Sequence, residues 1–137
     1  MDTRDLVTAL ESVLRPEGER IACAYLFGSH ARGAARGSSD VDVAVLFSQE
    51  PPHTLEGLGL DLVESMEAAI GRRVDLVALN RAPPDLVHRV LRDGILIAEN
   101  DHERRVDFEV KSRAEYFDVL PFLNEYRRNA GPRDNRR

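Results

Sequence analysis

The sequence has one cysteine, no tryptophan and no long apolar run. A single cysteine, Cys23, excludes an intramolecular disulfide and a cysteine metal cluster, and its apolar neighbours favour a buried side chain. No stretch approaches the roughly 20 apolar residues of a transmembrane helix. The polar beginning, residues 1–5, is unlike a signal peptide. We therefore expect no membrane association and a location in the reducing cytoplasm.

The sequence also lacks an excess of positive charge. Its 24 acidic and 19 basic residues give a net charge of −5, which disfavours broad contact with a phosphate backbone. We expect no direct nucleic-acid binding. The length of 137 residues fits one domain, without repeats or linkers. We place this domain at residues 1–126 and predict that residues 127–137, which include five arginines, form a mobile tail.

Apolar runs alternate with amphipathic stretches, which predicts an α/β fold with a mixed sheet of about four strands flanked by helices. Strands are expected at residues 21–27, 41–47, 74–79 and 95–98. The first helix is capped by Asp2 or Thr3, the second by Thr54, and the third begins at residues 83–85.

A long C-terminal helix is predicted to open with Asn100 and Glu103 as a capping box. Its apolar face carries Val106, Val110, Ala114 and Phe117, and Pro121 should end or kink it. Tyr116 and Phe117 are interpreted as helix packing residues.

The stretch from Gly28 to Asp42 joins the first two predicted strands and is rich in residues that bind charged groups. Because side chains alternate along a strand, Asp40 and Asp42 point the same way, with Cα atoms roughly 6.5 Å apart. Such close like charges repel each other, and a cation would relieve the repulsion. The short connection suggests that these two strands are antiparallel.

Asp75 begins the third predicted strand, which a crossover helix makes parallel to the second. The three carboxylates can therefore converge beside Ser29. Hard ions such as Mg²⁺ prefer carboxylate and phosphate oxygens, and two ions can clamp an in-line displacement. We predict a two-ion Mg²⁺ site bridged by Asp40 and Asp42, with Asp75 completing the shell and accepting a proton.

The glycine–serine loop is predicted to bind phosphate. Gly28 allows close approach of the backbone, and Ser29 offers a hydroxyl and an amide at a helix start. Arg32 and Arg36 could neutralise a triphosphate, although Arg32 could equally pair with a structural carboxylate and Arg36 could be a solvated loop charge. His30 could likewise be a surface residue.

Gly28-Ser29, ten intervening residues and then Asp40-Val41-Asp42 resemble the signature of DNA polymerase beta-like nucleotidyltransferases. With Arg32, Gly33 and Ser39, the pattern is similar to the minimal nucleotidyltransferase (MNT) domain. The resemblance continues at residues 74–77 and 115–118. It implies the nucleotidyltransferase fold, ATP as donor bound through Gly28, Ser29, Arg32 and Ser39, Mg²⁺, and the catalytic carboxylates Asp40, Asp42 and Asp75.

Stand-alone proteins of this kind resemble the antitoxins of HEPN/MNT toxin–antitoxin pairs. The resemblance implies AMP transfer from ATP to a tyrosine of a HEPN RNase toxin, in a hetero-oligomer. Two alternatives stay open: transfer to a small molecule such as an aminoglycoside, and a non-catalytic antitoxin that blocks the toxin by binding. The sequence does not specify the acceptor, the number of nucleotides added, the base or the stoichiometry.

Overall fold

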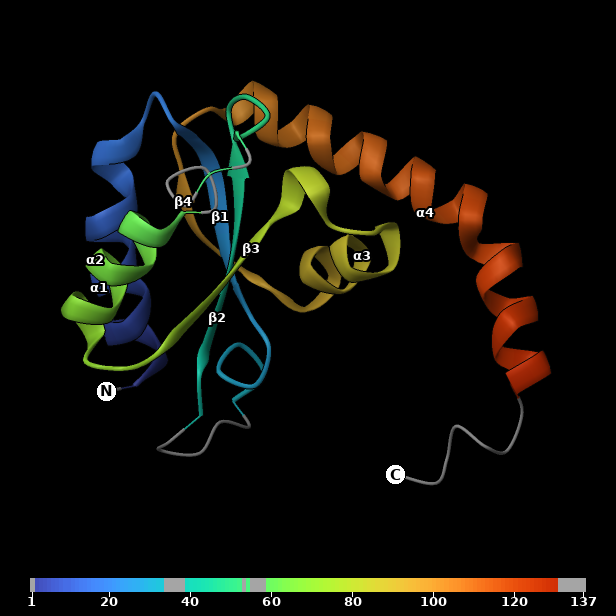
Figure 1. Ribbon diagram of the computed structural model, residues 1–137, viewed down its shortest axis with the longest axis horizontal. Helices are drawn as coiled ribbons and strands as arrows, with labels where there is room; N and C mark the ends of the chain where they lie inside the picture. Colours follow the sequence, from blue (N-terminus) through green and yellow to red (C-terminus); the bar gives the residue numbers. More distant parts are fainter. Residues whose placement is uncertain (1, 34–38, 53, 55–58, 131–137) are drawn as a thin grey trace.

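The computed structural model describes residues 2–33, 39–52, 54 and 59–130, and shows a four-stranded mixed sheet between two layers of helices (Figure 1). The strands are β1 (Ile21–Phe27), β2 (Val41–Phe47), β3 (Val74–Ala78) and β4 (Ile95–Glu99), in the order β3-β2-β1-β4. The helices are α1 (Thr3–Leu14), α2 (Leu60–Ile70), α3 (Pro84–Asp93) and α4 (His102–Ala130). The predicted fold class is confirmed.

The strand pairings also agree with prediction. β1 pairs antiparallel with β2 and with β4, while β2 and β3 run parallel. The α2 crossover connects the parallel pair, as a βαβ unit requires.

The alternation of side chains along β2 divides the core between the two faces of the sheet. Val41, Val43, Val45 and Phe47 pack in a cluster with residues of α1 and α2. Ala44 and Leu46 pack on the other side, with residues of α3. Every residue of β2 other than Asp42 is buried, so burial on both faces explains the near-continuous apolar sequence.

Two helix starts differ from prediction. α2 begins at Leu60 after Gly59, not after Thr54, and residues 55–58 lie outside the described part. The residue that caps α4 is Asp101, whose Oδ1 accepts from the amide of Arg104 at 3.0 Å. Asn100 instead donates to the carbonyl oxygens of Leu14 and Ile21, so it links α1, β1 and β4.

The apolar spacing of α4 predicted the wrong side of this helix as the side that packs on the sheet. Val106, Val110 and Phe117 are 38%, 60% and 65% exposed, so this face looks away from the sheet. Phe108 packs against the core instead. Tyr116 is a packing residue as predicted, since its ring stacks on His88 at 3.7 Å.

α4 continues through Pro121 to Ala130, so the proline does not end the helix. The ribbon changes direction in its second half, as it leaves the body of the molecule (Figure 1). Residues 127–130 are therefore helical, and the domain boundary and tail proposed from sequence stay predictions because residues 131–137 lie outside the described chain. No described helix is both long and apolar enough to span a bilayer.

Candidate active site

One edge of the sheet collects the residues that the sequence singled out. Asp42 pairs with Phe27 across β1 and with Asp75 across β3. Directly paired residues share a face of the sheet, so Asp42 and Asp75 lie on the side that α3 covers. Asp40 precedes Asp42 by two residues and is exposed, as is Asp75. The three carboxylates therefore lie at one end of β2 and β3.

Gly28 lies directly against the carboxylate of Asp42. A Cβ at this position would lie 2.1 Å from Oδ2 and 3.0 Å from Cγ of Asp42, and the glycine has φ of +75°. Both the left-handed backbone and the absence of a side chain are needed here. The Gly-Ser sequence thus fixes how closely the loop approaches the carboxylate.

Residues 28–33 form consecutive turns and not the helix start that was predicted at Ser29. The amide of Arg32 donates to the carbonyl oxygen of Gly28 at 3.2 Å. Nε2 of His30 lies 3.1 Å from the carbonyl oxygen of Ser39, so His30 links the two ends of the loop. Residues 34–38, with Arg36, lie outside the described part.

The electrostatics of Asp42 show that these groups act on one another. Burial is the largest cause that raises the pKa of Asp42, and the negative charges of Asp75 and Asp40 raise it further. His30 and Arg32 oppose this shift. His30 was left open by sequence reasoning, and its position next to Ser29 was the only signal for it. A cation at this edge would relieve the repulsion.

The donor chemistry suits a hard divalent ion. Among the described residues, no three His, Cys, Asp or Glu side chains are already arranged as a closed metal site. Mg²⁺ is normally held by one or two carboxylates, with substrate phosphates and water as the other ligands. The partly buried Asp42, repelled by two neighbouring carboxylates and backed by a glycine, fits this open type of site.

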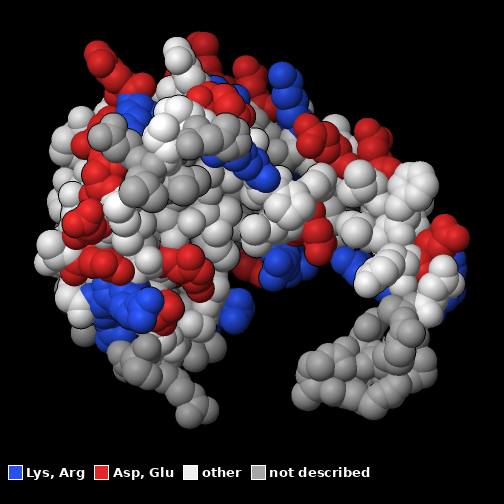
Figure 2. Space-filling view, in the orientation of Figure 1, with Lys and Arg blue, Asp and Glu red and all other residues white. Residues whose placement is uncertain are grey.

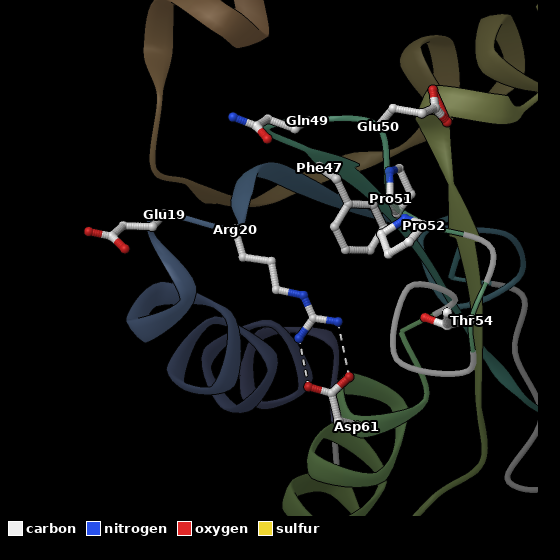
Figure 3. Close-up of a pocket in the computed structure, with 9 residues that line it drawn as sticks. All are labelled: Glu19, Arg20, Phe47, Gln49, Glu50, Pro51, Pro52, Thr54 and Asp61. Atoms are coloured by element: carbon white, nitrogen blue, oxygen red, sulfur yellow. Dashed lines mark hydrogen bonds and ion pairs between the residues drawn. The ribbon is translucent and has the colours of Figure 1, made fainter.

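A cavity of about 490 Å³ lies at the opposite end of β2, where Phe47 lines it (Figure 3). Arg20 pairs with Asp61 through two hydrogen bonds of 2.6 and 3.0 Å, and Pro51 and Pro52 lie together beside the Phe47 ring. None of the three carboxylates lines this cavity. It is therefore separate from the candidate active site.

Acidic and basic side chains are interspersed over the face seen in Figure 2. This distribution agrees with the net charge of −5 and offers no broad basic surface on that face. Cys23 is buried, as predicted, and burial raises the pKa of its thiol to about 11. The thiol is therefore protonated at neutral pH and unsuited to nucleophilic chemistry.

Comparison with known proteins identifies the family of this chain. The profile of the family described as polymerase beta, nucleotidyltransferase, matches residues 9–103. The protein adenylyltransferase MntA of Thermococcus cleftensis is 39% identical over 72 residues, which span 53% of this chain and 70% of that protein.

Two similar solved structures share the fold. A crystal structure of a toxin-antitoxin with AMP-PNP has a TM-score of 0.70 at 23% identity, over 88% of this chain and 97% of that chain. A structure of tri-AMPylated Shewanella oneidensis HEPN toxin in complex with MNT antitoxin has a TM-score of 0.66 at 21% identity, over 90% and 98% of the two chains. The range of the family match, residues 9–103, includes the glycine–serine loop and all three carboxylates. The chain therefore belongs to the polymerase beta nucleotidyltransferase family.

Proposed function

We propose that this chain transfers AMP from ATP to a tyrosine hydroxyl of a partner HEPN RNase toxin, and that it thereby acts as the antitoxin. The observation that carries this proposal is the pairing of Asp42 with Asp75 beside Gly28. The proposal is supported by the relative named protein adenylyltransferase and by the toxin–antitoxin structures that share the fold. It places the reaction in the reducing cytoplasm, in a hetero-oligomer with the toxin.

The carboxylates have distinct roles in this proposal. Asp40 and Asp42 would hold Mg²⁺, with Asp75 contributing to the shell, and the bound ion would supply charge neutralisation at the triphosphate. The backbone of Gly28, the Ser29 hydroxyl and the Ser39 segment would hold the phosphates. The Arg32 guanidinium, which is exposed and already within electrostatic reach of Asp42, would neutralise part of the phosphate charge.

The transfer step is an in-line displacement. The acceptor hydroxyl oxygen forms a bond to the α-phosphorus of ATP, and the bond from that phosphorus to the bridging oxygen of pyrophosphate breaks. Asp75 accepts the hydroxyl proton as general base. Its exposure at the rim of the site leaves it accessible to an acceptor that arrives from outside.

Incubation of the chain with labelled ATP, Mg²⁺ and the protein encoded by the adjacent reading frame, as the candidate toxin, tests this proposal directly. We expect label on the toxin with the wild-type chain and a loss of at least about a hundredfold with Asp40→Asn combined with Asp42→Asn, since electrostatic groups at the reacting centre contribute on this scale. Absence of toxin labelling despite ATP binding would contradict it.

A protection assay in cells separates catalysis from simple occlusion of the toxin. At equal abundance, the Asp40→Asn and Asp42→Asn double variant should fail to protect cells from the toxin. Protection at the wild-type level would instead establish the non-catalytic antitoxin.

A further inference from the structure

The second half of α4 exposes most of the surface of three aromatic side chains. We define residues 117–129 of this helix as the arm. Phe117, Phe122 and Tyr126 are 65%, 71% and 72% exposed. Among the described residues, these are the phenylalanine and tyrosine side chains that are largely exposed. Exposed aromatic groups gathered on one element mark an interaction surface more often than a solvated one.

The arm lies outside the catalytic domain but on its active side. The family match ends at residue 103, in the first turn of α4. α4 is held to α3 by the stack of Tyr116 on His88 and by the pair of Arg127 with Asp85 at 3.3 Å. α3 covers the face of the sheet on which Asp42 lies.

α3 also connects the arm to the candidate site. A Cβ at Gly94, directly after α3, would lie 3.2 Å from the carbonyl oxygen of Leu26. This carbonyl is two residues before Gly28, so the end of α3 touches the strand that carries the catalytic loop. A protein bound to the arm would therefore lie on the α3 side of the sheet, which is the side that carries Asp42, and Figure 2 shows open space between the arm and the body of the molecule.

The positions of the three aromatic residues identify the shape of the occupant. At about 100° per residue, Tyr126 lies about 180° around the helix from Phe117, and Phe122 lies on the Tyr126 side. One helix packed alongside, such as the arm of a second copy, would cover only one of these sides. Residues 131–137 contribute no large apolar side chain that could cover either.

The charges of the arm indicate how it is recognised. Asp118 and Glu125 balance Arg127 and Arg128, so the arm carries no net charge. Recognition then depends on the burial of aromatic surface and not on long-range attraction, which implies a weak response of affinity to salt.

We propose that the arm is the docking element for the acceptor protein, and that it inserts as a helix into an apolar groove between two helices of that protein. The name of the occupant rests on the proposed function. The binding mode is that of a helix in a groove, with aromatic anchors on both sides. The groove must be about one helix wide, or 10–12 Å.

Affinity measurements between the full chain and the protein of the adjacent reading frame, as the candidate acceptor, test the arm. The variant Phe122→Ala with Tyr126→Ala keeps a strong helix former at both positions and should weaken binding by at least about tenfold, because buried aromatic anchors dominate interfaces. The matched control, Val106→Ala with Val110→Ala, removes exposed apolar groups from the body-side part of the same helix. It should bind within about twofold of wild type, as expected for a surface change outside the interface.

Circular dichroism confirms that the variants remain helical, and sedimentation reports self-association. Wild-type affinity in the arm variant, equal weakening in the control, or a change only in self-association would each overturn the docking proposal. If the wild-type chain binds the acceptor through the arm without labelling it, adenylyl transfer fails while the docking site stands. If the arm variant binds and labels the acceptor as wild type does, docking fails while the transfer stands.

Discussion

Gly28 lies directly against the carboxylate of Asp42 in the candidate site. In Gly28→Ala the new Cβ would lie 2.1 Å from Oδ2 of Asp42, on a backbone with φ of +75°. We expect this variant to displace the carboxylate and to lose at least about tenfold in AMP transfer, because misplacement by about 1 Å is costly in an oriented site. The rate of toxin labelling measures it.

Gly33→Ala is the matched control for this substitution. Gly33 has a similar φ of +70°, but a Cβ there meets nothing within 4 Å. Its cost is confined to backbone strain of about 1–2 kcal/mol in stability, with transfer largely retained. Equal loss of transfer in both alanine variants would show that loop strain, and not the contact with Asp42, controls the reaction.

Asp42 should make the folded chain less stable as the pH rises. Burial and the charges of Asp75 and Asp40 raise its pKa from 3.8 in the folded state, so the folded chain binds this proton more tightly than the unfolded chain. The free energy of unfolding therefore falls as pH rises from 3.8 through the raised pKa.

We accordingly expect Asp42→Asn to unfold at a higher temperature than wild type at pH 7, and the difference to vanish at pH below 3.8. Thermal unfolding across pH measures both effects. Asp118→Asn, on the exposed surface of α4, is the control and should show neither. A less stable Asp42→Asn at pH 7 would mean that this carboxylate supports the fold and does not burden it.

At the residue scale, the sequence predicts which residues form the candidate site better than it predicts how they contact one another. The two-residue period placed Asp40 and Asp42 on one side, and the parallel pairing of β2 with β3 made Asp75 their neighbour. The approach of Gly28 to Asp42 depends on how the turn at residues 28–33 is closed. A glycine at position 28 permits that close approach, but the sequence does not reveal which side chain it approaches, so the contact with Asp42 could not be predicted.

At the scale of elements, α4 shows why apolar spacing alone can choose the wrong side of a helix. Its sheet side carries Phe108 together with Arg105 and Glu109, and these charged groups are satisfied by each other and by Tyr25. The opposite side has Val110 and Phe117, which resemble a core stripe in sequence. The spacing of apolar residues along a helix cannot reveal a polar partner on a strand, such as Tyr25 of β1. The strands β1 and β2 were predictable because both of their faces are apolar.

The bond between Tyr25 and Glu109 fixes α4 to β1. The Tyr25 hydroxyl donates to Oε2 of Glu109 at 2.6 Å, and Arg105 donates to the same oxygen at 2.7 Å. Burial alone would raise the pKa of Glu109, but these two hydrogen bonds hold it below its ordinary value. The contribution of this carboxylate to stability is therefore present at neutral pH and lost as the pH falls through its lowered pKa.

Tyr25→Phe should reduce the free energy of unfolding by about 1.5–3 kcal/mol, the range for a hydrogen bond to a charged group. Urea unfolding measures it, and a double-mutant cycle with Glu109→Gln isolates the pair. Tyr126→Phe, an exposed tyrosine of the same helix, should change stability by no more than about 0.5 kcal/mol. Additive effects of Tyr25→Phe and Glu109→Gln would contradict the coupling.

The whole molecule divides into a core that folds and a helix that extends beyond it. One of the two clusters of buried residues ends at Ala98 and the other ends, with its partly buried neighbours, at Phe108, so no described residue after Phe108 belongs to either cluster. This division matches the family match to residues 9–103. We therefore expect that the arm can be removed without loss of the folded core.

Ending the chain after Leu120 tests this division. The truncation retains the stack of Tyr116 on His88 and removes the exposed pair of Arg127 with Asp85, which is worth about 0–1 kcal/mol as a surface ion pair. The free energy of unfolding should therefore fall by no more than about 1 kcal/mol, and ATP with Mg²⁺ should still raise the melting temperature through binding to the folded state. Acceptor binding should be lost. A large fall in stability, or an undiminished affinity for the acceptor, would show that the arm is part of the folding unit or that another surface holds the partner.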